Sequence, residues 1–400
     1  MSGRAPGLAM SGHEQSQPAQ VAAMLMLLPS TLGECPGVFR TYLWWHILAP
    51  SGPRFAHMFV FLDKPFGASS EDLAANDAAA SNLEKWLKES PESARLRASV
   101  TLLDGSVAGA CCYAGDHGME KSAMRRLQPQ YYSELCAGAA MGELCAKQNL
   151  NMERCLILAD EIGMDWLVCN LDADEAFMSA HRVGKVFAKT PPNVLELWIL
   201  NHEAVPEVTE PSDFFITCTL FKKNPYCLGS AQRKATGFWR SKIMTDGRKL
   251  VVARTGDQQC LRGVGSDDMY FSAYWMGKSA VRVREGRKLG AFPQKSQFWN
   301  VPAEAKHRLS TKDGCILHYS NCQGFAGLVR KYKARTAEHW NLMATHSLCQ
   351  YMYRTGVDAL EEFYTKALLP QEEERQQIEE LISSGVCLRI ERVQEAAHSL

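Results

Sequence analysis

The 400-residue sequence lacks a net charge, since 44 lysine and arginine residues balance 44 aspartate and glutamate residues. A chain without an excess of one sign has no general field that attracts nucleic acid or an anionic membrane. A nucleic-acid function would need a local basic patch, and we expect no nucleic-acid partner. Long apolar runs are also absent: the run over 21–28 ends at Pro29 and is too short to cross a bilayer. We therefore expect no membrane span.

The sequence also lacks a C-x-x-C pair, although it contains 14 cysteines. These cysteines occur at irregular intervals in apolar segments, as at Cys155, Cys169, Cys218 and Cys315. Such usage is typical of buried, reduced thiols and argues against a disulfide framework or a zinc site. Together with the lack of a recognisable signal or anchor, it predicts a cytoplasmic protein.

Length and composition predict one large domain with appendages or two domains. A chain with 46% hydrophobic and 22% charged residues can bury a large core at this length. Residues 1–19 are rich in Gly, Ser, Pro and Gln, which predicts a disordered tail. The main domain is expected over 20–338. Residues 339–400 are expected to form a helical C-terminal region that serves as a lid, an oligomer contact or a partner surface.

Apolar runs and amphipathic segments alternate over the first half of the chain. The runs expected to be strands cover 21–28, 57–62, 98–103 and 166–171. The segments expected to be helices between them cover 39–48, 69–89 and 139–162. This alternation predicts an α/β fold with a mostly parallel central sheet flanked by helices.

The alternation weakens after residue 175. Shorter strands, expected to form an antiparallel extension, cover 194–200, 214–221, 249–253, 279–284 and 315–319. Residues 201–212 contain two prolines and are expected to form a polar loop. Three late segments with helical patterns, which predict the helical C-terminal appendage, cover 325–340, 346–367 and 371–384.

The strand that begins at Trp166 runs directly into three carboxylates, Asp172, Asp174 and Glu175. Acids at the carboxyl end of such a strand lie where open α/β sheets bind ligands. Two aspartates one residue apart can both reach one hard divalent cation, and a diphosphate can fill its remaining positions. The alternative is a solvated acidic turn that caps a helix after a core strand. The pattern by itself leaves both interpretations open.

Three separate segments together resemble the GT-A-fold glycosyltransferases, in particular the family-2-like and family-92-like enzymes. They are the helix and strand from Tyr42 to Asp63, the approach and acidic strand end from Gly163 to Glu175, and the late strand Ile316-Leu317-His318-Tyr319. The resemblance covers roughly residues 21–335. It implies a GT-A-type fold, and it leaves the segment 229–276 and the helical C-terminus unmatched.

The resemblance implies transfer of a sugar from a UDP- or GDP-sugar donor, with inversion, to a hydroxyl of a glycan, protein or small-molecule acceptor. It places Mn²⁺ or Mg²⁺ by Asp172 and Asp174, where a divalent ion stabilises the charge on the leaving nucleoside diphosphate. Glu175 would orient the aspartates or touch the sugar. His318 would be a distal metal ligand or a phosphate contact, although a lone histidine on an apolar strand is often a core residue.

Four more charged residues are candidates for donor binding. By the same resemblance, Asp63 contacts the nucleoside base or ribose, and Asp104 ends the next strand, although each also suits a simple turn. Lys278 and Arg282 resemble a basic element that neutralises the diphosphate. Exposed charges on a strand are the common alternative for both.

An inverting transferase also needs a general base that takes the proton of the acceptor hydroxyl. Asp267 and Asp268 lie at about the expected distance beyond the acidic strand end. Glu203, Glu207 and Asp213 compete for this role. Each of these five acids could instead be a helix N-cap or a surface residue.

Two other function classes remain open. One is a non-catalytic nucleotide- or sugar-binding protein that keeps the same fold. The other is a metal-dependent nucleotide enzyme of another kind, such as a nucleotidyltransferase. That enzyme would need a Gly-rich, Lys- or Arg-bearing loop after the first strand, and Pro-Ser-Thr-Leu-Gly over 29–33 is a poor match.

Overall fold

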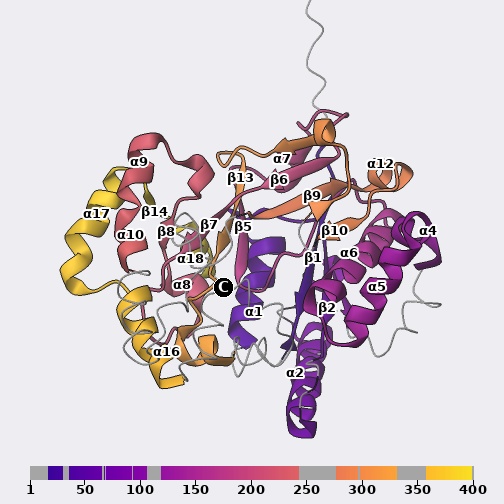
Figure 1. Ribbon diagram of the computed structural model, residues 1–400. Helices are drawn as coiled ribbons and strands as arrows, with labels where there is room; N and C mark the ends of the chain where they lie inside the picture. Colours follow the sequence, from indigo (N-terminus) through magenta and orange to yellow (C-terminus); the bar gives the residue numbers. More distant parts are fainter. Residues whose placement is uncertain are drawn as a thin grey trace, which may run out of the picture.

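The computed structural model describes residues 17–29, 36–64, 67, 69–91, 93–105, 119–242, 276–295, 298–330 and 357–398. Within these residues the chain forms a large, mostly parallel sheet flanked by helices, a second mixed sheet and a set of C-terminal helices (Figure 1). The fold class expected from the sequence, α/β with an antiparallel extension and a helical C-terminus, is therefore confirmed.

The large sheet contains seven strands in the described part of the chain. In spatial order they are β12 (Lys306–Arg308), β6 (Glu196–Ile199), β9 (Lys278–Arg282), β4 (Trp166–Val168), β1 (Val21–Leu27), β2 (His57–Leu62) and β3 (Val100–Asp104). The pairs β4–β1, β1–β2, β2–β3 and β6–β12 are parallel, whereas β9 runs antiparallel to both β4 and β6. The carboxyl ends of β1 to β4 therefore meet at one edge of the sheet.

The second sheet contains five described strands and begins where the acidic segment ends. Its order is β14 (Cys387–Arg389), β8 (Leu220–Lys222), β7 (Asn201–Ala204), β13 (Gly314–His318) and β5 (Glu175–Ser179). β13 pairs antiparallel with β5 and parallel with β7. Because β14 follows the C-terminal helices and joins this sheet, the end of the chain packs directly on the preceding region.

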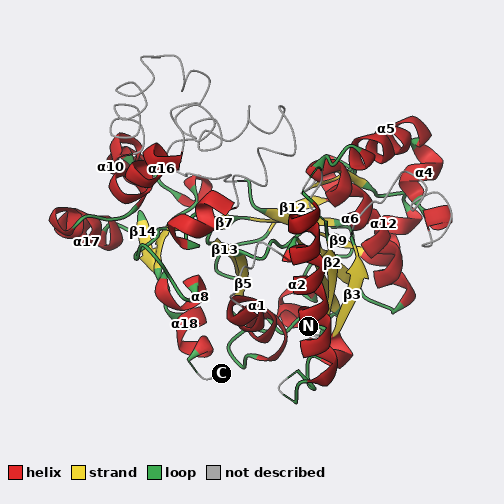
Figure 2. Cartoon of the chain, turned by 90° about the horizontal axis from the view of Figure 1, so that it is seen from below, coloured by secondary structure: helices red, strands yellow, loops and turns green. Residues whose placement is uncertain are grey.

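Helices cover both faces of the large sheet. Those before the second sheet are α1 (Pro36–Leu43), continued by a π-helical turn (Trp44–Leu48), α2 (Ser70–Glu89), α4 (Ala123–Leu127), α5 (Pro129–Ala140) and α6 (Leu144–Glu161). Those after β5, the first strand of the second sheet, are α7 (Val183–Phe187), α8 (Phe214–Thr217), α9 (Ser230–Ala235), α10 (Gly237–Ser241), α12 (Val283–Lys288), α16 (Val357–Phe363), α17 (Arg375–Ser383) and α18 (Arg392–Ala397). Figure 2 shows α16 to α18 on the side of the molecule opposite α4 to α6.

The strand β1 is buried on both faces, as its continuous apolar sequence predicts. Val21, Ala23 and Leu25 pack into one core cluster with residues of α1, and Ala22 and Met24 pack into another with residues of α6.

No helix in the described part of the chain is both long and apolar enough to cross a bilayer. Among the described cysteines, Cys155, Cys169, Cys218 and Cys315 are buried free thiols.

Several predicted elements differ from the structure for local reasons. The segment 214–221, expected as one strand, begins as helix α8 because the Asp213 carboxylate caps it by accepting the backbone N–H of Phe215. The helix expected over 139–162 is divided into α5 and α6 at Gly142, which has a φ of 84°. The segment 201–212, expected as a loop, starts as the buried strand β7. The strand expected over 249–253 lies outside the described residues.

Candidate donor-binding site at the acidic strand end

The strand β4 ends at Val168, three residues earlier than the sequence predicts. Asn170 then adopts a positive φ of 46°, which is uncommon for a residue other than glycine and turns the chain sharply. After the turn, the backbone N–H of Asp172 donates to Glu175 Oε2 (2.9 Å), and that of Glu175 donates to the Asp172 carbonyl (2.9 Å). The acid block, defined as Asp172, Asp174 and Glu175, is thus a closed turn that links the two sheets.

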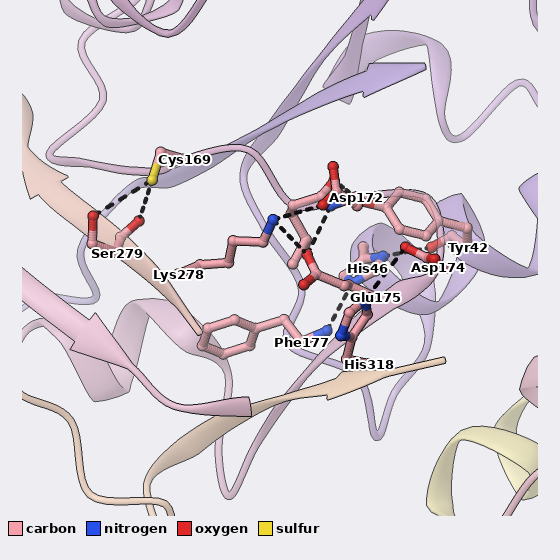
Figure 3. A network of polar contacts seen from close by, with 11 residues as sticks. Tyr42, His46, Cys169, Asp172, Asp174, Glu175, Phe177, Lys278, Ser279 and His318 are labelled. Atoms are coloured by element: carbon pink, nitrogen blue, oxygen red, sulfur yellow. Dashed lines mark hydrogen bonds and ion pairs between the residues drawn. The ribbon is translucent and has the colours of Figure 1, made fainter. Parts of the chain in front are cut away.

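His318 reaches the acid block through strand pairing. In the antiparallel register of β13 and β5, His318 lies directly opposite Glu175. The backbone N–H of the next residue, Tyr319, donates to the Asp174 carbonyl (2.7 Å). Figure 3 shows the His318 ring beside the Asp174 carboxylate, with Nε2 3.9 Å from Oδ1. Both side chains are buried.

Lys278 approaches the acid block from the start of β9. Its Nζ lies 2.7 Å from Asp172 Oδ2 and 3.3 Å from Glu175 Oε2, and the residue is fully buried (Figure 3). Burial alone would lower the pKa of this ammonium, but the carboxylates of Asp172 and Glu175 raise it well above its usual value. Lys278 therefore stays charged and holds two of the three acids.

The turn from β4 into β5 rests on the segment 42–46, whose individual contacts the sequence did not reveal. The Tyr42 hydroxyl donates to the Leu171 carbonyl (3.0 Å), and the ring of Trp45 donates to the Phe177 carbonyl (3.0 Å). His46 Nε2 accepts the Phe177 backbone N–H (3.0 Å), which requires a neutral ring that donates from Nδ1 to the Tyr42 carbonyl (2.8 Å). Burial lowers the pKa of His46 to about 3. The aromatic Tyr-Leu-Trp-Trp-His sequence was the available signal.

Asp63 and Asp104 stand at neighbouring strand ends along the same edge. Asp63 is buried, and both of its carboxylate oxygens lie 3.2 Å from Lys147 Nζ on α6. Burial raises the pKa of Asp63, and the charge of Lys147 opposes this shift. Asp104 ends β3, and its carbonyl accepts a hydrogen bond from Arg154 (3.0 Å). Sequence reasoning missed Lys147, because a lysine in an amphipathic helix normally faces solvent.

The acids differ in their fitness for a divalent cation. Within the described residues no three histidine, cysteine or carboxylate side chains converge on one point. The 3.9 Å between Asp174 Oδ1 and His318 Nε2 is too long for a hydrogen bond. It lies between the separations of about 3 Å and about 4.2 Å for neighbouring and opposite ligands of one octahedral ion with bonds of about 2.1 Å. Asp174 and His318 have donor atoms that divalent ions take, but their separation matches neither arrangement without a shift of a side chain, whereas Asp172 is held in the ion pair with Lys278.

One other candidate, Arg282, is not brought to the acid block, and two more cannot be placed. Arg282 lies at the far end of β9, where its guanidinium stacks over Trp166 at 4.5 Å and donates to the carbonyls of Thr190, Pro191 and Val194. It is thus a structural residue at the amino end of β4. Asp267 and Asp268 lie outside the described residues.

The competing acids are all engaged in contacts of the fold. Glu203 is fully buried in an ion pair with Lys222. The Asp213 carboxylate accepts from the Thr41 hydroxyl (2.6 Å) besides capping α8. Glu207 accepts backbone N–H groups where β8 begins. None of them is presented as a base for an acceptor hydroxyl.

Comparison with known proteins gives two similar sequences, and no protein-family model matches the chain. Both are Arabidopsis thaliana proteins named glycosyltransferase-like. One is 26% identical over 182 residues, which cover 44% of this chain and 34% of that protein. The other is 24% identical over 182 residues, which cover 44% of this chain and 30% of that protein. The match thus spans about a third of each relative, and it supports a relationship to glycosyltransferases.

Proposed function

We propose that this protein is a glycosyltransferase that moves a sugar from a nucleoside-diphosphate sugar to an acceptor hydroxyl. One observation carries the proposal: the acid block lies at the carboxyl edge of a mostly parallel sheet, with His318 and Lys278 against it. This edge is the usual ligand site of an open α/β sheet. The two similar proteins named glycosyltransferase-like support the same reaction class.

The donor lies along the ends of β2, β3 and β4. Asp63 and Asp104 face the nucleoside, and the acid block faces the diphosphate. Asp174 and His318 would hold a Mn²⁺ or Mg²⁺ ion, and such an ion would stabilise the negative charge of the leaving diphosphate. Lys278 adds a permanent positive charge beside the same group and keeps Asp172 and Glu175 in position.

The attacking hydroxyl displaces the diphosphate with inversion, as in the enzymes that the sequence resembles. A base must take the proton of that hydroxyl as the new glycosidic bond forms. We assign this role to Asp267 or Asp268, because Glu203, Glu207 and Asp213 are committed to the fold.

The test is a titration of UDP and GDP into the protein with and without Mn²⁺, followed by a turnover screen of UDP- and GDP-sugars. Asp174→Asn should abolish the metal-dependent part of the binding and lower donor turnover about 100- to 1000-fold, as expected for losing one electrostatic stabiliser of the transition state. Asp77→Asn is the matched control, since Asp77 is an exposed partner of Lys64. Equal loss in both variants, or no metal-dependent turnover of any donor, contradicts the proposal.

A non-catalytic nucleotide-binding protein is the second candidate, and the Lys278–Asp172 ion pair favours it, because this pair occupies one of the three expected metal ligands. The same titration separates the two. A binding protein takes up UDP or GDP with millimolar or better affinity, yet releases no sugar from any donor, and Asp174→Asn then changes only the binding constant.

A further inference from the structure

A cavity of about 570 Å³ lies at the opposite end of β13 from the acid block. It is lined by residues at the end of α7, on β6, on and after β12, and in the turn after β8. Thr311 and Asp313 line it just before β13 begins at Gly314, whereas His318 ends that strand. Four residue steps of about 3.3 Å separate the two ends by roughly 13 Å. The cavity is therefore distinct from the proposed donor site.

The lining of this cavity is basic. Lys189, Lys223 and Arg308 contribute permanent positive charges, and Asp313 is the acidic residue among the lining side chains. In the part of the chain that the structure describes, none of these three cations has an ion-pair partner. The neighbouring Lys306, by contrast, is paired with Glu196 at 3.0 Å. Three cations against one lining carboxylate give the described part of this concavity a net positive charge, which attracts an anion.

An aromatic ring stands beside these charges. Tyr226 lines the cavity and is 42% exposed, and its ring is held edge-on against Trp198 with centroids 5.2 Å apart. The guanidinium of Arg308 lies 5.8 Å from the centre of the Tyr226 ring. The exposed part of this ring offers an apolar surface to the apolar face of a ligand ring. The Ser310 and Thr311 hydroxyls add hydrogen-bonding groups.

We infer that this basic cavity, defined by Lys189, Lys223, Tyr226 and Arg308, binds an anionic saccharide. The sugar ring packs on Tyr226, and its phosphate, sulfate or carboxylate group lies between Arg308 and Lys223. A guanidinium and an ammonium are the groups that proteins use for such anions. The volume falls within the usual range for small-molecule sites. The inference does not rest on the proposed transferase activity.

The test uses calorimetric titration of the full chain with three probes: glucose 6-phosphate, glucose and inorganic phosphate. Glucose 6-phosphate should bind at one site, at least ten-fold more tightly than either glucose or phosphate. The double variant Lys223→Gln/Arg308→Gln should weaken its binding at least ten-fold. Tyr226→Ala should weaken glucose 6-phosphate several-fold and leave phosphate unchanged.

Two controls separate this cavity from other sites. The charge-matched double variant Lys85→Gln/Lys88→Gln, on α2, and Asp174→Asn, in the acid block, should both leave the affinity for glucose 6-phosphate unchanged. Thermal melts show whether each variant is folded. The inference is overturned if the wild-type chain does not bind glucose 6-phosphate at 10 mM. It is equally overturned if Asp174→Asn weakens binding as much as the cavity variants do, or if phosphate alone binds as tightly and Tyr226→Ala has no effect.

Discussion

Charged side chains lie at both ends of β13, but they are buried and paired at the acid block and exposed at the basic cavity. At the acid block, Lys278 and Glu175 are fully buried and lie within 3.3 Å of each other. At the basic cavity, Lys189 and Arg308 are exposed and have no ion-pair partner among the described residues. Buried charges must satisfy one another, because each alone would carry a large desolvation cost. Exposed charges are solvated by water, and they remain available to a ligand.

The buried set continues across the second sheet. Strand register places Glu175 opposite His318, His318 opposite Glu203, and Glu203 opposite Lys222. Directly opposed residues project from the same face of a sheet, so these side chains form one row. The two glutamates of this row are held by ion pairs, Glu175 with Lys278 and Glu203 with Lys222, and removing either lysine leaves a buried carboxylate without its cation. The basic cavity has no comparable row.

The largest expected effect is on stability, from Lys278→Met. This change leaves Glu175 buried without its cation, and breaking a buried pair from one side costs about 3–5 kcal/mol. Urea unfolding followed by circular dichroism measures the loss of unfolding free energy. The exposed lysine Lys88, paired with Glu84, is the matched site, and Lys88→Met should leave the free energy unchanged within error.

The double variant Lys278→Met/Glu175→Gln tests the cause of that loss. A glutamine keeps an acceptor for the Asp172 backbone N–H and removes the stranded charge. It should recover part of the lost stability. If the double variant is less stable than Lys278→Met alone, the pairing of charges is not what stabilises this end of the molecule.

A second, smaller effect is a dependence on pH at the acid block. Burial lowers the pKa of His46 from 6.5 to about 3, so the folded state favours the neutral ring. This contribution is complete above pH 6.5 and is lost as the pH falls toward 3, because the unfolded chain then binds the proton more readily. Between pH 7 and pH 4.5 this loss is about 2–3 kcal/mol.

His46→Gln isolates this histidine from His202, whose pKa burial also lowers, to about 4. A glutamine at position 46 can still accept the Phe177 N–H, but it does not titrate. Urea unfolding at both pH values should show a smaller acid-induced loss of unfolding free energy in the variant than in the wild type, by about 2–3 kcal/mol. Equal losses would mean that His46 is already protonated in the folded state.

The smallest effect is expected from Arg308→Gln at the basic cavity. Its stability should stay within about 0.5 kcal/mol of the wild type, since the side chain is exposed and has no ion-pair partner among the described residues. Thermal melts in low and high salt provide the measurement. A large loss of stability would show that Arg308 supports the fold, and the contrast between the two ends would then be false.

Local sequence predicted much of the framework. β1, β2 and β3 lie within one or two residues of the expected runs, and α2 begins where Ser69 caps it, because apolar content and capping are local properties. The prediction was weakest from residue 201 to residue 221. There Asp213 caps a short helix where an apolar run predicted a strand. The polar segment that begins at residue 201 forms the strand β7 because it pairs with β13 and β8.

By itself, the sequence determined that an apolar strand ends in three acids and that further acids end the neighbouring strands. Only the tertiary structure decided which partner each acid has. Lys278 meets Asp172 across 106 positions of the chain, and His318 meets Asp174 across a sheet pairing. Such contacts depend on strand order and register, which no local pattern encodes. Strand direction also explains why Arg282 lies away from the acids. It follows Lys278 by four residues on β9 and therefore lies at the other end of that strand, opposite Trp166 at the start of β4.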